Sequence, residues 1–415
     1  MTVTETRVQA LTVETTALDD IRQLIPIVDP RRPLLWLRKG EGLAGIGEAL
    51  RLEFSGPTRV SDASAAWREV VAHATVVDPL GVPGSGLVAF GTFAFSASSA
   101  ETSALIVPET IIGRRDGRCW MTRIGATGAA PPSVPPVSRA LGDEYRIALL
   151  PGSLSADGFT TLVAKAVDRI AHREVSKVVL ARDLVGHLPP ESDLRRVVRD
   201  LALGYPDCWT YAVDGLVGSS PETLIRAHRG ELNARVLAGT ISRGPDAASD
   251  QAAAVALATS EKDKDEHEFA VQSVLAALRP HASHLATSEV PFTLKLPNLW
   301  HLATDIEGSL SDGSTSLDLV AAMHPTAAVA GTPTDAALTL IEELEPFDRG
   351  RYAGPVGWVG ADGDGEWAIA LRCAQVARNG DIRAYAGCGI VAESVPEHEL
   401  AESRMKFRPI VEAFN

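Results

Sequence analysis

The sequence predicts an α+β fold in which large mixed or antiparallel sheets are flanked by helices. Segments rich in β-branched residues, typical of strands, occur together with segments whose apolar side chains recur every three or four positions, typical of helices. The two kinds do not alternate in the regular strand–helix–strand order of a parallel sheet. Apolar residues make up 45% of the 415 residues and charged residues 22%, the balance of a globular chain with a buried core.

Each predicted element rests on a local pattern. Residues 157–173 carry apolar side chains at helical spacing. A helix over residues 260–279 begins at Ser260, which with Asp263 resembles a capping box. Its apolar side comprises Phe269, Val271, Val274, Leu275 and Leu278. The other predicted helices are residues 334–344 and 397–413, and the predicted strands are residues 86–95, 177–185, 209–213, 223–227, 354–359, 366–373 and 382–385.

Turn and linker signals organise these elements. The glycine-rich turn at residues 362–365 links two of the strands as an antiparallel pair. The segment 128–136 holds four prolines, which cannot continue a helix or a central strand, so it is predicted to be extended and exposed. Composition alone therefore divides the chain into residues 1–127 and 145–415.

Charge and cysteine content exclude several functional classes. The net charge of −14 disfavours a nucleic-acid or membrane-surface binder, because such proteins need clustered Lys and Arg. The four cysteines form no CxxC pair, so neither a zinc site nor a disulfide framework is expected, and a reducing cytosol fits. No secretory signal and no membrane-spanning apolar run is visible. We expect a cytoplasmic protein.

Two residues are candidate proton-transfer groups. Lys177 begins an apolar strand, where it is either an edge charge that reaches solvent or a buried lysine whose lowered pKa lets it act as a base. Glu222 follows Pro221 and precedes a strand, so it either starts that strand or is a general acid held on a rigid loop.

Two helices and one glycine-rich segment offer ligands for ions. Asp263 and Glu266 share one helix face, and Glu402 shares another with Glu399 and Lys406. These are either solvated faces with surface ion pairs or carboxylate sites for a hard cation such as Mg²⁺. The segment 386–391, predicted to follow a strand as a turn, is a weak signal for anion binding by backbone amides.

The order and spacing of ten motifs resemble the chorismate-utilising enzymes. That family includes isochorismate synthase, salicylate synthase, anthranilate synthase component I and aminodeoxychorismate synthase component I. The resemblance covers residues 145–415, whereas residues 1–144 match the N-terminal portion of the family's fold loosely. The motifs are KVVLAR (177–182), SPE (220–222), LAGT (237–240), EKDKDEH (261–267), HLAT (301–304), HPT (324–326), RYAGP (351–355), ALRC (370–373), GCGIV (387–391) and ESRMK (402–406).

This resemblance implies a single large chorismate-binding domain, like that of anthranilate synthase component I, in place of the two portions suggested by composition. It implies chorismate as substrate and Mg²⁺ as cofactor, with Glu266 and Glu402 as the metal ligands. Positions matching the pocket for the enolpyruvyl carboxylate are Tyr352, Arg372 and the amides around Gly387, and further substrate positions are Thr240, His301 and Lys406.

The resemblance also favours particular members of the family. Anthranilate synthase would have Gln at position 177, where this chain has Lys177, and aminodeoxychorismate synthase would have a nucleophilic lysine in place of Ala238. The water-activating enzymes remain, so no glutaminase subunit is expected. The segment 324–331 looks more like isochorismate synthase, although Ala328 and Ala330 depart from the common pattern and leave salicylate synthase as the alternative. Lys177 would activate water and Glu222 would protonate the departing ring hydroxyl.

Overall fold

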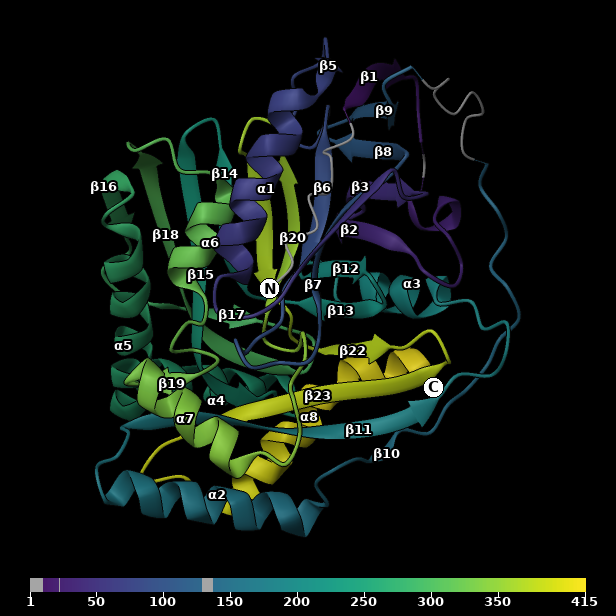
Figure 1. Cartoon of the computed structure of the whole chain (residues 1–415). Coiled ribbons are helices and arrows are strands. Elements are labelled where there is room, and N and C mark those ends of the chain that lie inside the picture. Colours follow the sequence, from purple (N-terminus) through teal and green to yellow (C-terminus); the bar gives the residue numbers. More distant parts are fainter. Residues whose placement is uncertain (1–9, 22, 129–136) are drawn as a thin grey trace.

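Two large sheets, almost entirely antiparallel, form the framework of the computed structural model, which describes residues 10–21, 23–128 and 137–415 (Figure 1). In Figure 1 the strands of one sheet run across those of the other, which is the arrangement of orthogonally packed sheets. The first sheet follows the order β10 (Leu150–Pro151), β11 (Lys177–His187), β23 (Asp381–Ile390), β22 (Cys373–Val376), β13 (Leu216–Ser220), β12 (Trp209–Val213), β2 (Leu34–Arg38), β3 (Glu41–Ile46), β8 (Thr110–Arg115), β9 (Arg118–Ala126), β1 (Leu11–Leu18) and β5 (Thr75–Val77), with β19 (Gly331–Thr332) beside β11.

The second sheet lies mainly on the left of Figure 1. Its order is β16 (Ala282–Thr287), β18 (Leu299–Leu310), β15 (Glu231–Ser242), β14 (Thr223–His228), β21 (Gly365–Ile369), β20 (Pro355–Gly360), β6 (Val88–Thr92), β7 (Ser103–Val107) and β4 (Leu50–Phe54), with β17 (Phe292–Lys295) beside β18.

Both sheets join the two halves of the sequence. In the first sheet β2 pairs with β12, and in the second β6 pairs with β20. The single-domain prediction is confirmed, because neither sheet can be divided at the proline-rich segment. Of that segment only Gly128 is described; residues 129–136 lie outside the described residues, so the predicted extended linker stays a prediction.

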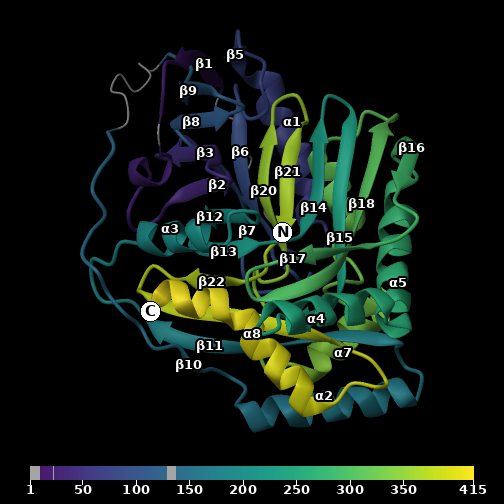
Figure 2. The same cartoon turned by 180° about the vertical axis from the view of Figure 1, so that it is seen from behind.

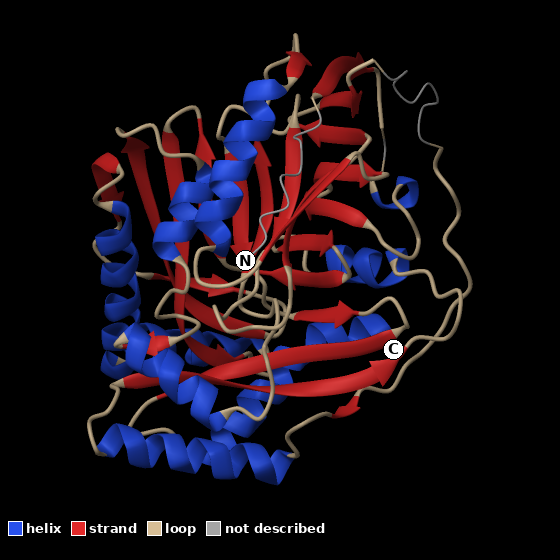
Figure 3. Cartoon of the chain, in the orientation of Figure 1, coloured by secondary structure: helices blue, strands red, loops and turns tan. Residues whose placement is uncertain are grey.

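Helices cover the outer faces of the sheets (Figure 3). On one side α1 (Arg59–His73) packs on α6 (Ser316–Met323), while α8 (Pro396–Phe414) lies against β23 and α2 (Ala156–Ala171), as the rear view shows (Figure 2). The remaining helices are η1 (Ile25–Ile27), α3 (Arg195–Gly204), α4 (Ala247–Thr259), α5 (Glu261–Leu278) and α7 (Thr334–Leu344). None of the helices in the described ranges is long and apolar enough to span a bilayer.

Most predicted elements are present within a few residues of their predicted ends. The Ser260 side chain caps α5 by accepting a hydrogen bond from the backbone N–H of Asp263 at 3.2 Å. Phe269 is a wrong assignment: it is 64% exposed, and the buried face of α5 is instead made by Ala270, Val271, Val274 and Leu278. Phe269 lies just outside the helix face that packs against the sheet, and its neighbour Ala270 lies on that face.

Two further predictions are wrong in ways that matter for the site. The strand predicted over residues 366–373 is two strands, because β21 ends at Ile369 in the second sheet and β22 begins at Cys373 in the first. The segment 386–391 is not a turn: residues up to Ile390 continue β23 and pair with β11. Neither difference is visible locally, because each depends on which distant strands the segment pairs with.

Candidate active site

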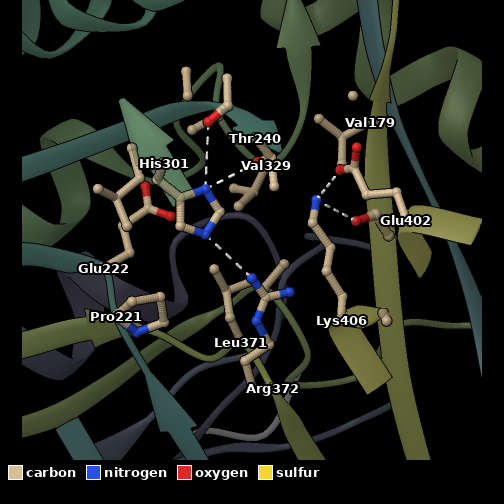
Figure 4. A pocket seen from close by; sticks show the side chains of 18 of the residues that line it. Val179, Pro221, Glu222, Thr240, His301, Val329, Leu371, Arg372, Glu402 and Lys406 are labelled. Carbon is tan, nitrogen blue, oxygen red and sulfur yellow. Dashed lines mark hydrogen bonds and ion pairs between the residues drawn. The ribbon is translucent and has the colours of Figure 1, made fainter. Parts of the chain in front are cut away.

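A cavity of about 180 Å³ lies where the two sheets meet α5 and α8 (Figure 4). All ten residues singled out in the sequence line it, although they are spread over more than half of the chain. They are Lys177, Glu222, Thr240, Glu266, His301, Tyr352, Arg372, Gly387, Glu402 and Lys406.

Glu222 and Arg372 lie where the chain passes from one sheet to the other. Glu222 stands between β13 of the first sheet and β14 of the second, and Arg372 between β21 and β22. Arg372 takes a left-handed backbone angle, φ 50°, which turns the chain between the sheets. A crossing between sheets frees a side chain from the alternation of a strand, so both residues can point into the space between the layers.

Glu222 is a buried acid. Only 6% of the residue is exposed, and burial raises the pKa of its carboxyl to about 8 against the opposing influence of Lys177, Arg372 and Lys406. The carboxyl is therefore mostly protonated at neutral pH, and it can donate a proton to a bound molecule.

Lys177 forms an ion pair with Glu266 of α5. The residue is 8% exposed, so it is not the solvent-reaching edge charge that the sequence left open. Gly389 of β23 makes room for the pair, because a Cβ there would lie 2.9 Å from Lys177 Cε and 3.2 Å from Glu266 Oε1. The third residue of the glycine motif is thus needed for space beside the pair.

On the right of Figure 4, Lys406 joins α8 to β23. Its Nζ lies 2.6 Å from Glu402 and donates to the Gly387 carbonyl at 2.9 Å. Burial disfavours the charged amine, but the Glu402 carboxylate outweighs burial and raises the Lys406 pKa above its ordinary value. Lys406 is a fixed cation at the end of the cavity.

The backbone N–H of Gly387 is available to a ligand, whereas its carbonyl accepts from Lys406. Ala181, its partner on β11, donates its N–H away from β23 to Glu345, so the two residues form a non-hydrogen-bonded pair. Both backbone groups of Gly387 consequently point to the other edge, where pairing with β22 stops at Tyr385. A side chain at Gly387 is excluded, since its Cβ would lie 2.6 Å from the Leu180 carbonyl oxygen.

A chain of polar contacts fixes Thr240, His301 and Arg372. The Thr240 hydroxyl lies 2.9 Å from His301 Nδ1, and Arg372 donates to His301 Nε2 at 3.4 Å. Burial, with Arg372 and Lys406 nearby, holds the His301 pKa well below its ordinary value. The neutral ring accepts at Nε2, so it carries its proton on Nδ1 and donates it to Thr240.

Tyr352 and its neighbours close the cavity. The Tyr352 ring stacks on Tyr385 at 5.2 Å between centroids, and burial raises the Tyr352 pKa, so its hydroxyl stays protonated. Tyr385 and Gly389 also line the cavity and were not singled out from the sequence. A signal for them existed: residues 385, 387 and 389 alternate along one strand and so share one face.

Carboxylates gather near Lys406. Ligand atoms of Cys388, Glu399 and Glu402 lie within 4.8 Å of one another. Burial raises the pKa of the Cys388 thiol well above its ordinary value, and a sulfur ligand suits a hard cation less well than oxygen does. The donors that remain are oxygens, the kind preferred by a hard divalent cation.

Comparisons with known proteins agree with this geometry. The family model described as "Chorismate binding enzyme" matches residues 4–129 and 144–415. Isochorismate synthase DhbC of Bacillus subtilis is 40% identical over 284 residues, which is 66% of this chain and 70% of the relative.

Two solved structures share the fold. The DhbC structure from Bacillus anthracis has a TM-score of 0.77 and 29% identity and covers 94% of this chain and 99% of its own. MenF of Escherichia coli, described as the menaquinone-specific isochorismate synthase, has a TM-score of 0.78 and covers 98% of this chain and 95% of its own; at 24% identity it supports the fold alone. With ten motif residues around one cavity and a family model that matches nearly the whole chain, the protein belongs to the chorismate-binding enzymes.

Proposed function

We propose that the protein is an isochorismate synthase, which moves the hydroxyl of chorismate from ring carbon 4 to ring carbon 2. The observation that carries this proposal is the pairing of a buried amine, Lys177, with a buried protonated acid, Glu222, around one cavity. The 40% identity to the Bacillus subtilis isochorismate synthase supports the same assignment.

The reaction needs one base and one acid. Neutral Lys177 takes a proton from water while the water oxygen bonds to ring carbon 2. The two ring double bonds shift, the bond between carbon 4 and its oxygen breaks, and Glu222 gives its proton to the departing hydroxyl. No net oxidation or reduction occurs, and each proton transfer contributes roughly 10²–10⁴-fold to the rate.

Lys177 must be uncharged to act in this way. In the structure its amine contacts the Glu266 carboxylate. Glu266 thus has two partners in the proposed cycle: Lys177 before the site is loaded, and a cation afterwards.

We propose Mg²⁺ as the cofactor, held by Glu266 and Glu402. The available donors, with Glu399 beside Glu402, are carboxylate oxygens, which fit this ion. Bound Mg²⁺ would balance the charge of the ring carboxylate. The chain's own hydrogen-bond donors would serve the second carboxylate: Arg372, the Gly387 amide and the Tyr352 hydroxyl would bind the enolpyruvyl group, while Thr240, His301 and Lys406 complete the pocket.

Amination of chorismate is disfavoured by the cavity wall. Ala238 lines the cavity and offers no nucleophile for a covalent route, so we propose that no glutaminase subunit takes part. Salicylate synthase remains the second candidate, because Ala328 also lines the cavity and departs from the isochorismate synthase pattern.

Product analysis decides between these functions. The purified protein is incubated with chorismate and Mg²⁺, and the products are separated by chromatography. Isochorismate alone is expected, with no dependence on ammonium or glutamine. Salicylate as the main product would favour the second candidate, and failure to consume chorismate would overturn both.

A further inference from the structure

A second, much smaller cavity lies behind Glu222, on the side of the second sheet. Its volume is about 10 Å³, the room that one water molecule needs. Residues 222–224 of the β14 side, residues 234–236 of β15 and Thr326 contribute to its wall. Glu222 therefore borders two spaces, the active-site cavity in front and this small cavity behind.

The small cavity lies where the ladder between β14 and β15 opens. The pairing of these strands runs from His228↔Glu231 to Arg226↔Asn233 and goes no further among the described residues. On its other edge β14 is irregular, with a register shift between Thr223 and Ile225. Backbone groups that a continuous ladder would pair must find another partner, and water is the usual one.

The buried hydroxyl of Thr326 is a second group that needs a hydrogen-bond partner such as water. The residue is 5% exposed, and its hydroxyl has no hydrogen-bond partner among the described residues. Its backbone is firmly held, since the Thr326 carbonyl accepts from the N–H groups of Val329 and Ala330. A buried hydroxyl without a partner is costly, and a bound water removes that cost.

We propose that one ordered water occupies this cavity and links the Thr326 hydroxyl to the Glu222 carboxyl, which makes Thr326 a positioning residue for the proton donor. The water donates to one carboxyl oxygen of Glu222. The other oxygen, which carries the proton, is left to face the substrate. The water site follows from the cavity and the hydroxyl alone, whereas its part in catalysis rests on the proposed function.

The charged groups around Glu222 do not replace this water. Lys177, Arg372 and Lys406 act on Glu222 from the active-site side, on β11, the sheet crossing and α8. Neutral His301 lines that side as well. Behind Glu222, Arg235 borders the small cavity, but its guanidinium is bound to Asp305 through two hydrogen bonds.

The first test is structural and needs no activity. A high-resolution crystal structure should show a water within hydrogen-bond distance of Thr326 Oγ1 and a Glu222 carboxyl oxygen, and Thr326→Val should lose it. The Val variant should also melt at a lower temperature, because it breaks a satisfied contact; removing a hydroxyl that truly lacks a partner would raise the melting temperature. A dry cavity, or a water out of reach of Glu222, overturns the proposal.

The second test is kinetic and compares Thr326→Val with Thr326→Ser, which keeps the hydroxyl. The Val variant should lose about tenfold or more in kcat with little change in KM. The high-pH limb of its pH–rate profile should move to higher pH, because ionised Glu222 has lost a hydrogen-bond donor. The Ser variant should restore both kcat and the position of this limb. Unchanged kcat and pH profile in the Val variant would refute the positioning role. If the wild-type protein makes no isochorismate, the proposed function and this role fail together, while crystallography and melting still decide the water site.

Discussion

Burial decides the chemistry available to individual residues of this site. Glu222 has lost its contact with bulk water, and this outweighs three nearby cations, so its pKa is raised to about 8. Lys406 is largely shielded from water, with 14% of its side chain exposed, but the adjacent Glu402 carboxylate raises its pKa and keeps it charged. The same cavity thus holds an acid that keeps its proton and a cation that keeps its charge. Their nearest neighbours cause this difference.

Glu222→Gln tests the proton donor. The amide keeps the shape but cannot deliver the proton, so kcat should fall by at least about 10² with little change in KM. In the wild type, kcat should decline as the pH rises through about 8, since the protonated carboxyl is the active form. Steady-state kinetics across pH measure both, with exposed Glu397→Gln on α8 as the matched control. A change confined to KM would mean that Glu222 only binds substrate.

Lys177→Gln tests the base. Isochorismate formation should be abolished while chorismate binding is largely retained, because binding rests on Arg372, Lys406 and the Gly387 backbone. Product chromatography measures isochorismate formation, and calorimetric titration measures chorismate binding. Added ammonium should give slow amination in the variant, since that nucleophile needs no base. Hydroxyl transfer at a near wild-type rate would refute the role of Lys177.

At the scale of elements, strand β23 shapes the floor of the site through its two glycines. Gly387 presents its backbone to the cavity and Gly389 leaves space for the Lys177–Glu266 pair. Helices α5 and α8 bring carboxylates toward this strand from two sides. The site is therefore assembled between strand β23, helix α8 that follows it in the chain, and helix α5 from much earlier in the sequence.

Gly389→Ala should displace the ion pair without unfolding the protein. Its Cβ would approach Lys177 Cε to 2.9 Å, so the pair must shift, and kcat should fall by about tenfold or more. Gly125→Ala on β9 is the matched control, because a Cβ there meets nothing within 4 Å. Circular dichroism measures the folding of both variants, and steady-state kinetics measure their kcat. Equal activity in the two variants would show that the packing at Gly389 is unimportant.

Glu402→Gln tests the proposed metal site between α5 and α8. One carboxylate fewer should weaken Mg²⁺ binding, and it leaves Lys406 without its ion-pair partner. We expect the Mg²⁺ concentration needed for half-maximal activity to rise at least tenfold, and calorimetric titration of Mg²⁺ should show the same loss. Glu266→Gln should behave alike. Full activity of Glu402→Gln at limiting Mg²⁺ would count against this site.

At the scale of the whole molecule, residues 1–127 complete both sheets. Strands β2 and β6 stand in the middle of the two sheet orders and pair with β12 and β20 of the later sequence. Trp36 of β2 stacks on Trp209 of β12 at 4.8 Å, which ties the halves through their cores. The residues that line the cavity come from the later half, whereas both sheets that frame it include strands of the first half.

A chain truncated to residues 145–415 should therefore fail to fold into an active enzyme. The truncation uncovers strand edges and the apolar surface around Trp209, Tyr211 and Trp358, all buried in the full chain. Circular dichroism, limited proteolysis and chorismate turnover measure the outcome, with the full chain as reference. A truncated protein that is cooperative in melting and active would disprove the single-domain interpretation.

The sequence by itself determined the fold class, the spans of most helices and strands and, through the resemblance to the chorismate-utilising enzymes, ten of the residues that line the cavity. These follow from local signals, such as the Ser260 cap and the β-branched strand from Lys177, and from the order of short motifs. Local signals report periodicity and residue type, and both are properties of neighbours in the chain.

Only the tertiary structure decided what depends on distant partners. The split of residues 366–373 into β21 and β22, the continuation of β23 through Gly387 and Gly389, and the exposure of Phe269 depend on which segments pack together. The raised pKa of Glu222 and the Lys177–Glu266 pair arise from burial and from contacts across the sheets. Burial and pairing are set by residues up to hundreds of positions away, so no local pattern of apolar or charged residues carries them.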